Sequence, residues 1–466
     1  MLRSRWIALP LAVLGSGVAE AAIPSQPTVV GSDITTVTLV SQTESHVLSW
    51  SDVSSTTIEP GTWEMRFSVP GGATALFIPV CAGRKRVSVD GPPQALGTGP
   101  VVMDLAPTSA EHRVAIELSV GSYEHRATCG EPPRAGVRRE GRVDGLLPLD
   151  FASPHAAAGG GHAVVFVPPG HDPGRPGPVL VGLHPWSGSM WTYAAYDTLL
   201  AAARAADVVL LFPSGLGNSL YTRAAEDEAL LALDAAASTV RLDPGRVTLW
   251  GASMGGAGAT TIGFHHPDRF AAVVSLFGDS KYDLTTYVHA LLPTEHAAHL
   301  VNALDIVDNA RNLPVWLIHG EDDRVSPLQQ SAMLARALSA LHFAVTFDRV
   351  PQAGHDGRVV SRFASRIVDL AARARRVDSP ARVSYWSVAA GQDEAYGVRL
   401  TRASAAGDAF FDLERDGDTV HLRRASNVRA LRLPRGAFGL APTATPDVVR
   451  DDPSMQAIAI SWDPLP

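Results

Sequence analysis

A serine set between two glycines is the residue best suited to do chemistry in this chain, in the string GASMG at residues 251–255. The string follows residues 246–250, a strand-like run, and opens a stretch of small residues. Glycines two positions before and after the serine let the backbone crowd closely without a Cβ clash. A sharp turn at a strand end exposes such a hydroxyl for attack. The context predicts that Ser253 is a nucleophile rather than part of a structural glycine turn.

A hydroxyl is a weak nucleophile near neutral pH, so Ser253 needs an imidazole as general base and a carboxylate that orients it. His355 lies in a glycine-flanked loop after the last expected strand and is the predicted base. The string HGEDDRV at residues 319–325 places acidic side chains just after an earlier strand. Asp323 is the predicted acid. Asp322 stays an alternative, because adjacent side chains after a strand point in different directions.

Acyl transfer also needs N–H donors aimed at the negative charge that develops on the attacked carbonyl oxygen. The turn itself places the backbone N–H of Met254 for this task. The second donor is expected in the loop after an early strand, in the string LHPWSGS at residues 183–189. Pro185 has no N–H to give. Trp186 is therefore predicted as the second donor, although its ring could equally line a binding wall or the core.

The other histidines of the catalytic half are expected to be structural. His319 lies at a strand end before a glycine, which favours a packed side chain. His265 and His266 precede Pro267 where a helix should end, which favours capping of the free carbonyls there. No set of His, Cys and carboxylate residues has the spacing of metal ligands, so we expect neither a metal nor a cofactor.

Strands that alternate with helices indicate an α/β fold with a mainly parallel sheet around these residues. Two alanine- and leucine-rich helices are expected at 225–240 and 327–341, and a last helix carries Phe363, Ile367 and Leu370 at helical spacing. The stretch 281–312 is predicted either to cap the pocket or to pack as an amphipathic helix. The expected strands are 162–167, 179–184, 208–213, 247–250, 270–276, 315–319 and 345–350.

Short runs of alternating apolar and polar residues flank this α/β part on both sides. They predict a β-sandwich-like module before it and a smaller β module after it. A stretch rich in Pro, Gly and Arg near 130–145 and a Ser-Pro pair at 379–380 mark the boundaries. The predicted division is 1–21 signal peptide, 22–140 N-terminal module, 141–377 catalytic domain and 378–466 C-terminal module.

Six short motifs follow one another along the central part of the chain: FPSGLG at 212–217, EDE at 226–228, GASMGG at 251–256, HPDRF at 266–270, HG at 319–320 and GH at 354–355. In type and order they resemble the motifs of secreted α/β-hydrolases: the catalytic domain of prolyl oligopeptidases and related exported esterases, such as feruloyl and acetylxylan esterases and polyhydroxyalkanoate depolymerases. The resemblance covers about 145–376 and implies a Ser253, Asp323, His355 triad with a covalent acyl-enzyme intermediate. It does not separate an ester substrate from a peptide.

The first residues have the three regions of a secretory signal peptide, with Arg3 and Arg5, an apolar run from 6 to 18, and Ala-Glu-Ala before a cleavage site after Ala21. We therefore expect a secreted or periplasmic protein. In such a compartment Cys81 and Cys129 are predicted to form a disulfide, two buried free thiols being the alternative.

Composition limits the class of partner. The formal net charge of −8 is spread along 466 residues without a large basic cluster, so a nucleic-acid partner is not expected. No apolar run has the length of a membrane span. The oligomeric state is not predicted. The chain is thus expected to be an exported serine hydrolase for an ester or short peptide, and the alternative is a non-catalytic carbohydrate- or surface-binding protein on a hydrolase scaffold.

Overall fold

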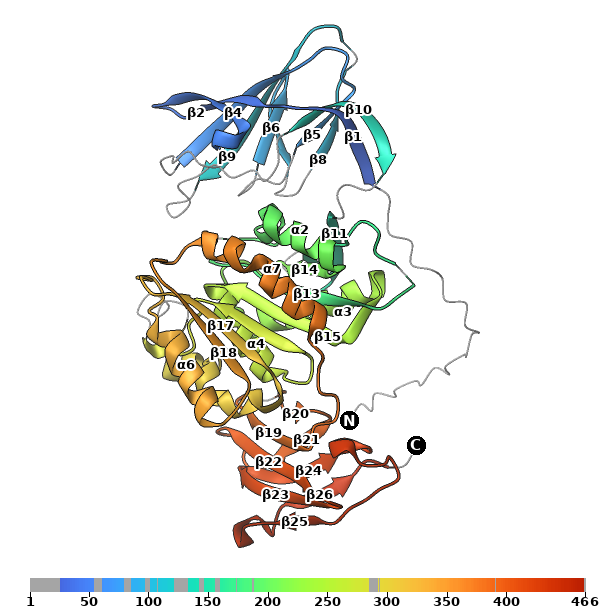
Figure 1. The fold of residues 1–466 in the computed structure, drawn as a ribbon, viewed down its shortest axis with the longest axis vertical. Coiled ribbons are helices and arrows are strands. Elements are labelled where there is room, and N and C mark those ends of the chain that lie inside the picture. The colour runs from blue at the N-terminus through green and yellow to red at the C-terminus, as the bar shows by residue number, and fades with distance from the viewer. Residues whose placement is uncertain are drawn as a thin grey trace, which may run out of the picture.

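Three β-containing parts follow one another along the chain, a sandwich, an α/β unit and a second, smaller sandwich (Figure 1). The computed structural model describes residues 26–464, apart from 54–60, 79–84, 97–100, 107, 121–132, 142–145, 156–159, 173, 187, 285–291, 293 and 390. The predicted signal peptide and the predicted disulfide between Cys81 and Cys129 lie outside the described residues. Among the helices that the structure describes, none is long and apolar enough to cross a bilayer.

The central unit is built on an eight-stranded, mainly parallel sheet, and this confirms the predicted α/β-hydrolase fold. The six strands from β14 to β18 in the sheet run parallel, and β11 and β12 pair antiparallel at one edge. All seven strands expected from the sequence are present, and β11 is an additional one. In spatial order they are β11 (Leu146–Ala152), β12 (Gly160–Phe166), β14 (Val209–Pro213), β13 (Gly177–Leu183), β15 (Leu242–Ala252), β16 (Ala272–Leu276), β17 (Val315–Gly320) and β18 (Val345–Val350).

Helices cover both faces of this sheet because its parallel strands are joined by crossovers. One face carries α3 (Ala224–Thr239), α4 (Met254–His265), η4 (Ala303–Asn312) and α6 (Gln329–Ala340), and the other carries α2 (Asp197–Ala206) and α7 (Gly357–Arg373). The stretch 281–312 also contains η2 (Tyr282–Leu284) and α5 (Glu295–His299), and η1 (Tyr193–Ala195) precedes α2.

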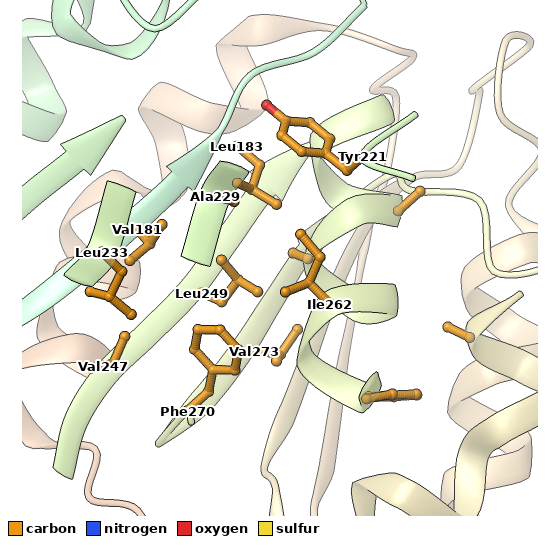
Figure 2. Packing of buried hydrophobic residues seen from close by; sticks show 14 of the residues in the cluster. Val181, Leu183, Tyr221, Ala229, Leu233, Val247, Leu249, Ile262, Phe270 and Val273 are labelled. Carbon is orange, nitrogen blue, oxygen red and sulfur yellow. The ribbon is translucent and has the colours of Figure 1, made fainter. Parts of the chain in front are cut away.

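Strands buried on both faces need apolar residues at every position, and β13, β14, β16 and β17 are buried throughout. Figure 2 shows the core on the α3 and α4 face, where Leu249 of β15 and Val273 of β16 lie beside Ile262 of α4. Three buried residues of η4, Ala303, Ile306 and Ala310, join the same core. The part of the stretch 281–312 that forms η4 is therefore a packing helix.

The N-terminal sandwich has a core of its own between two antiparallel sheets. In β4 every second residue from Trp63 to Val69 is buried, which is the alternation expected of a strand with one face on the core. One sheet has the order β1 (Gln26–Asp33), β10 (Arg134–Gly141), β5 (Ala75–Ile78) and β8 (Val101–Asp104). The other has β3 (Ser45–Ser49), β2 (Thr36–Val40), β4 (Gly61–Val69), β9 (His112–Val120), β6 (Lys85–Val89) and β7 (Gln94–Leu96), with α1 (Trp50–Val53) beside it.

The C-terminal sandwich is tied directly to the α/β unit. The Tyr385 hydroxyl lies 2.9 Å from the carbonyl oxygen of His265, where α4 ends, and Asn309 donates to the carbonyl oxygen of Trp386. Val388 is buried in the core of the α/β unit. The two sheets are β19 (Arg382–Ser387), β22 (Ala409–Asp416), β23 (Thr419–Ser426), β25 (Val448–Arg450), and β20 (Glu394–Ala395), β21 (Val398–Arg402), β24 (Val428–Leu433), β26 (Ala459–Trp462), with η5 (Ala437–Gly439) and η6 (Pro453–Met455) between strands.

Candidate active site

Ser253 stands at the turn between β15 and α4 with a backbone conformation that few non-glycine residues adopt, φ +57° and ψ −122°. The turn is held because the Ser253 N–H donates to the carbonyl oxygen of Leu276 in the next strand, at 2.9 Å. A Cβ on Gly255 would collide with the carbonyl oxygen of Leu183, and one on Gly251 with the carbonyl oxygen of Gly255. The two glycines of the GASMG string are therefore required by close backbone packing.

A buried tyrosine fastens this turn to the neighbouring strand. The hydroxyl of Tyr193 donates to the carbonyl oxygen of Leu183 and accepts from the N–H of Ala252, each at 2.9 Å. Burial raises the pKa of the Tyr193 hydroxyl, so the group stays a neutral donor and acceptor. The end of β13 and the residue before Ser253 are thus held at a fixed separation.

Three predicted side chains lie in one hydrogen-bonded row. Nε2 of His355 is 2.8 Å from Oγ of Ser253, and Nδ1 of His355 is 2.8 Å from Oδ2 of Asp323. An ionised carboxylate only accepts, so Nδ1 carries the proton and Nε2 is free to accept from the serine hydroxyl. The alternative acid, Asp322, is exposed, whereas Asp323 is buried. The geometry brings Asp323, and not Asp322, to the imidazole.

Asp323 is held in its charged form by donors on both oxygens. Oδ1 accepts from the N–H groups of Val325 and Ser326, at 2.8 and 3.0 Å, while Oδ2 faces His355. Burial disfavours the charged form, but contacts from His319, His355 and the N–H of Val325 outweigh burial and lower the pKa of Asp323 well below its usual range. The carboxylate is therefore negative at every pH at which an imidazole can act as a base.

His319 lies behind this carboxylate as a fully buried, hydrogen-bonded side chain, and this confirms its predicted structural place. Its Nε2 donates to the carbonyl oxygen of Ser326 at 2.9 Å, and its Nδ1 lies 2.8 Å from Oγ of Ser331. The hydroxyl of Ser326 in turn donates to Oδ1 of Asp279 at 2.6 Å. The loop that carries Asp323 is thus pinned by buried polar contacts along its length.

The two predicted N–H donors come from segments in contact. Met254 opens α4, and the first N–H groups of a helix have no partner inside it. Trp186 follows β13, and its side chain is 40% exposed. A Cβ on Gly255 would also come within 2.9 Å of the carbonyl oxygen of His184, so the loop after β13 lies directly against the start of α4.

The expected capping role of His265 and His266 is wrong. Both side chains reach sideways to Glu226 of α3, with Nδ1 of His265 at 2.9 and 3.0 Å from the carboxylate oxygens and Nε2 of His266 at 2.7 Å. The end of α4 already has a donor, because the Tyr385 hydroxyl donates to the carbonyl oxygen of His265. The buried carboxylate of Glu226 therefore has the greater need for hydrogen-bond donors. No spacing in the sequence signals this contact, because Glu226 and His265 lie 39 positions apart in the chain.

Part of the α/β unit is similar to a known protein family. Residues 217–373 match the model of the prolyl oligopeptidase family. The chain is a serine hydrolase. No curated protein matches it in sequence. The matched segment begins before α3 and ends with α7, so it includes Ser253, Asp323 and His355.

Solved structures of hydrolases are similar to about half of this serine hydrolase. The S-formylglutathione hydrolase of Agrobacterium tumefaciens is 18% identical, with a TM-score of 0.43, over 50% of this chain and 97% of that chain. A ferulic acid esterase is 17% identical, with a TM-score of 0.42, over 49% and 98%. The acylaminoacyl peptidase of Pyrococcus horikoshii is 17% identical, with a TM-score of 0.42, over 50% and 42%. The fold is identified from strand order and the turn at Ser253, since these scores lie below 0.5.

Sequence reasoning did not find four residues that support the site: Tyr193, Phe277, Ser326 and Ser331. The ring of Phe277 lies 4.6 Å from the ring of His355, centre to centre. The hydroxyl of Tyr193 contacts the backbone of Leu183 and Ala252, and the N–H of Ser326 donates to the carboxylate of Asp323. Phe277 and Ser331 contact the rings of His355 and His319. No sequence motif predicts such contacts. Of the four, only Ser326 could have been proposed from the sequence, because it directly follows the string that carries Asp323.

Proposed function

We propose that the chain is an exported hydrolase that cleaves an ester or short peptide bond through Ser253, His355 and Asp323. The observation that carries the proposal is the row of two 2.8 Å hydrogen bonds from Oγ of Ser253 through His355 to Asp323. A nucleophile, a base within reach of it, and an acid that fixes the base are the parts that acyl transfer requires.

In this mechanism Ser253 attacks the carbonyl carbon of the substrate while Nε2 of His355 takes the hydroxyl proton. The charge on the imidazolium is balanced by Asp323, which stays ionised because its pKa is lowered. The N–H groups of Met254 and Trp186 receive the negative charge on the carbonyl oxygen. His355 then gives the proton to the leaving group, and an acyl-Ser253 intermediate forms.

Water releases the acyl group by the reverse of these steps. His355 takes a proton from the water, the hydroxide attacks the acyl carbon, and Ser253 leaves with the proton restored to its oxygen. The reaction consumes one water and yields a carboxylic acid and an alcohol or amine. No metal or redox group takes part in any step.

The test is hydrolysis of short and long p-nitrophenyl acyl esters by the protein starting at Ala22, compared with Ser253→Ala and His355→Ala. We expect both variants to lose at least about a thousandfold in kcat/KM. Equal rates in the three proteins would overturn the Ser253 mechanism. A proline-containing amide and an acyl ester of matched size, assayed side by side, separate a peptidase from an esterase.

Export is a separate part of the proposal and rests on the pattern of residues 1–21. Expression of the full chain with a periplasmic or culture-medium fractionation, and N-terminal sequencing of the product, tests it. A product that begins at Ala22 outside the cytoplasm is expected. A full-length product in the cytoplasm would contradict export and leave the hydrolase proposal untouched.

A further inference from the structure

The chain that leaves β16 lies among the segments that carry the three proposed catalytic residues. In the sheet, β16 is the strand between β15, which leads into the turn at Ser253, and β17, which is followed by Asp323. The loops that form a site in such a sheet lie at the carboxyl ends of the strands. Residues 276–280, at the carboxyl end of β16 and just beyond it, are all buried. Their contacts with each catalytic residue can be followed one by one.

The beginning of this segment holds the nucleophile. The carbonyl oxygen of Leu276 accepts from the N–H of Ser253 at 2.9 Å. Gly278 packs against the first turn of α4, because a Cβ there would come within 2.3 Å of the backbone nitrogen of Ala257 and 2.4 Å of the backbone carbon of Gly256. Only glycine allows so close an approach. The segment therefore lies directly against the turn and the helix that carry the nucleophile.

Phe277 lies against the base, in a backbone conformation that is strained for so large a residue. Its φ is +40°, a value that glycine adopts freely and a bulky residue rarely does. The centre of its buried ring is 4.6 Å from that of His355 and 6.4 Å from that of His319. Backbone outliers of this kind cluster at active sites, where the surrounding structure holds them. The strained position carries a ring where glycine would be relaxed, which points to a use for the ring.

The ring of Phe277 supplies a restraint on His355 that the hydrogen bonds do not. Those bonds hold the imidazole at Nδ1 and at Nε2, so the ring can still tilt about the line that joins the two atoms. Contact with Phe277 limits this tilt. The lone pair of Nε2 lies in the plane of the imidazole, and a hydrogen bond weakens as its angle departs from linear. A fixed tilt therefore keeps that lone pair directed at Oγ of Ser253.

Asp279 reaches the acid through Ser326. Oδ1 of Asp279 accepts from the Ser326 hydroxyl at 2.6 Å, and the Ser326 N–H donates to Oδ1 of Asp323 at 3.0 Å. One serine thus joins two buried carboxylates, and a shift of the first is passed to the second. The end of the segment is fixed as well, because the Ser280 hydroxyl donates to the carbonyl oxygen of Gln330 in α6 at 2.7 Å.

From these contacts we propose that Phe277 and Asp279 are positioning residues that act as one unit and hold His355 and Asp323 in line with Ser253. The inference rests on the proposed Ser253 mechanism. The two side chains are two residues apart on one buried segment, whose backbone is also bound to β17 by the N–H of Phe277. A change that loosens the segment at either position therefore displaces both the base and the acid.

The test is hydrolysis of a p-nitrophenyl ester by the protein starting at Ala22 and by Phe277→Leu, Asp279→Leu and the double variant. Each rate is divided by the amount of serine that a fluorophosphonate probe labels at completion, so that unfolded protein is not counted. We expect kcat to fall about a hundredfold in each single variant with KM unchanged, the order of effect of a 1 Å misplacement. The double variant should lose about as much as the worse single variant, because the two residues act as a unit.

The two single losses multiply to about 10⁴-fold if the residues act separately. A double variant with that loss would overturn the proposal, and so would a parental kcat in either single variant. Asp279→Asn keeps an oxygen that can accept from Ser326 and should recover most of kcat. No recovery in Asp279→Asn would show that the contact with Ser326 does not position the acid, and would also overturn the proposal.

A matched phenylalanine separates positioning from loss of stability. Phe270 is buried to a similar degree and precedes β16, about 20 Å along the strand from Phe277. Phe270→Leu should lower the melting temperature much as Phe277→Leu does and leave kcat unchanged. An equal loss of kcat in Phe270→Leu would assign the effect to stability and overturn the proposal.

Ser253→Ala, measured beside these variants, keeps this inference apart from the proposed function. A Ser253→Ala protein as active as the parent would reject the Ser253 mechanism itself. An inactive Ser253→Ala protein beside fully active Phe277→Leu and Asp279→Leu proteins would reject the positioning role alone.

Discussion

Nε2 of His319 lies 3.5 Å from Oδ2 of Asp323, the oxygen that also faces His355. The hydrogen on that nitrogen is donated to the carbonyl oxygen of Ser326 at 2.9 Å. His319 therefore positions the loop that carries Asp323 and takes no part in proton transfer. One buried imidazole therefore sets the position of the carboxylate that orients the other imidazole.

Replacing His319 is expected to lower kcat without changing KM, because a displacement of the acid misplaces His355 but not the bound substrate. His319→Phe should lose about a hundredfold in kcat, the order of effect of a 1 Å misplacement in an active site. His319→Gln, whose amide can still donate to Ser326, should recover part of it. An equal rise in KM in both variants would point to general unfolding of the site instead.

Asp322 and Asp323 are neighbours in the sequence, so the same substitution at each position tests which of them is the catalytic acid. Asp323→Asn is expected to lower kcat about 10⁴-fold, because the amide favours the wrong tautomer of His355. Asp322→Asn changes an exposed side chain and should leave kcat within about twofold of the parent. Steady-state kinetics on a p-nitrophenyl ester measures both. The reverse order of effects would make Asp322 the acid.

Tyr193→Phe removes the hydroxyl that joins Leu183 to Ala252, so each of these two buried backbone groups loses a hydrogen bond. The loss in free energy of unfolding should be about 2 kcal/mol. kcat should fall as well, since Ala252 precedes Ser253. Urea unfolding measures the change in the free energy of unfolding, and ester hydrolysis measures the change in kcat. Tyr196→Phe, from the same aromatic cluster, is the control, and the same loss there would show that any hydroxyl in the cluster has this effect.

Glu226 is expected to make stability depend on pH in the acid range. Its folded pKa of about 2 lies below the ordinary value of 4.5, so its contribution is complete above pH 4.5 and is lost as pH falls toward 2. Glu226→Gln should cost about 3 kcal/mol at neutral pH and flatten this part of the stability curve. Urea midpoints at a series of pH values measure it.

Asp227→Asn, one residue further along α3, alters an exposed carboxylate that lies 3.1 Å from His155. It is expected to leave both the neutral stability and the acid slope nearly as in the parent. If Glu226→Gln were no more sensitive than Asp227→Asn, the histidine cluster would contribute no net stability.

Much of the fold could be predicted from the sequence, because strands buried on both faces are continuous apolar runs. β11 escaped prediction since Pro148 interrupts its pattern, yet proline is tolerated there because β11 is an edge strand. η4 could not be separated from a pocket cap, since its apolar spacing is the same for either use. Only the structure shows that Ile306 points into the main core.

Some residues of the candidate site could likewise be predicted from the sequence, and others could not. Ser253 and His355 could be found because their neighbours in the sequence are glycines that the turn and loop demand. The hydrogen-bond partners of His265 and His319 could not be predicted, because these contacts join residues that lie 39 and 12 positions apart in the sequence. A hydrogen bond across an interior leaves no spacing in the sequence to detect.

The C-terminal sandwich holds the end of α4, the helix that begins next to Ser253, and places Val388 in the core of the α/β unit. The N-terminal sandwich instead closes its core with its own residues. For protein engineering the two additions are therefore not equivalent. The smallest segment that can be transplanted with its catalytic helix intact must run past β26, and a fusion partner can replace the N-terminal sandwich but not the C-terminal one.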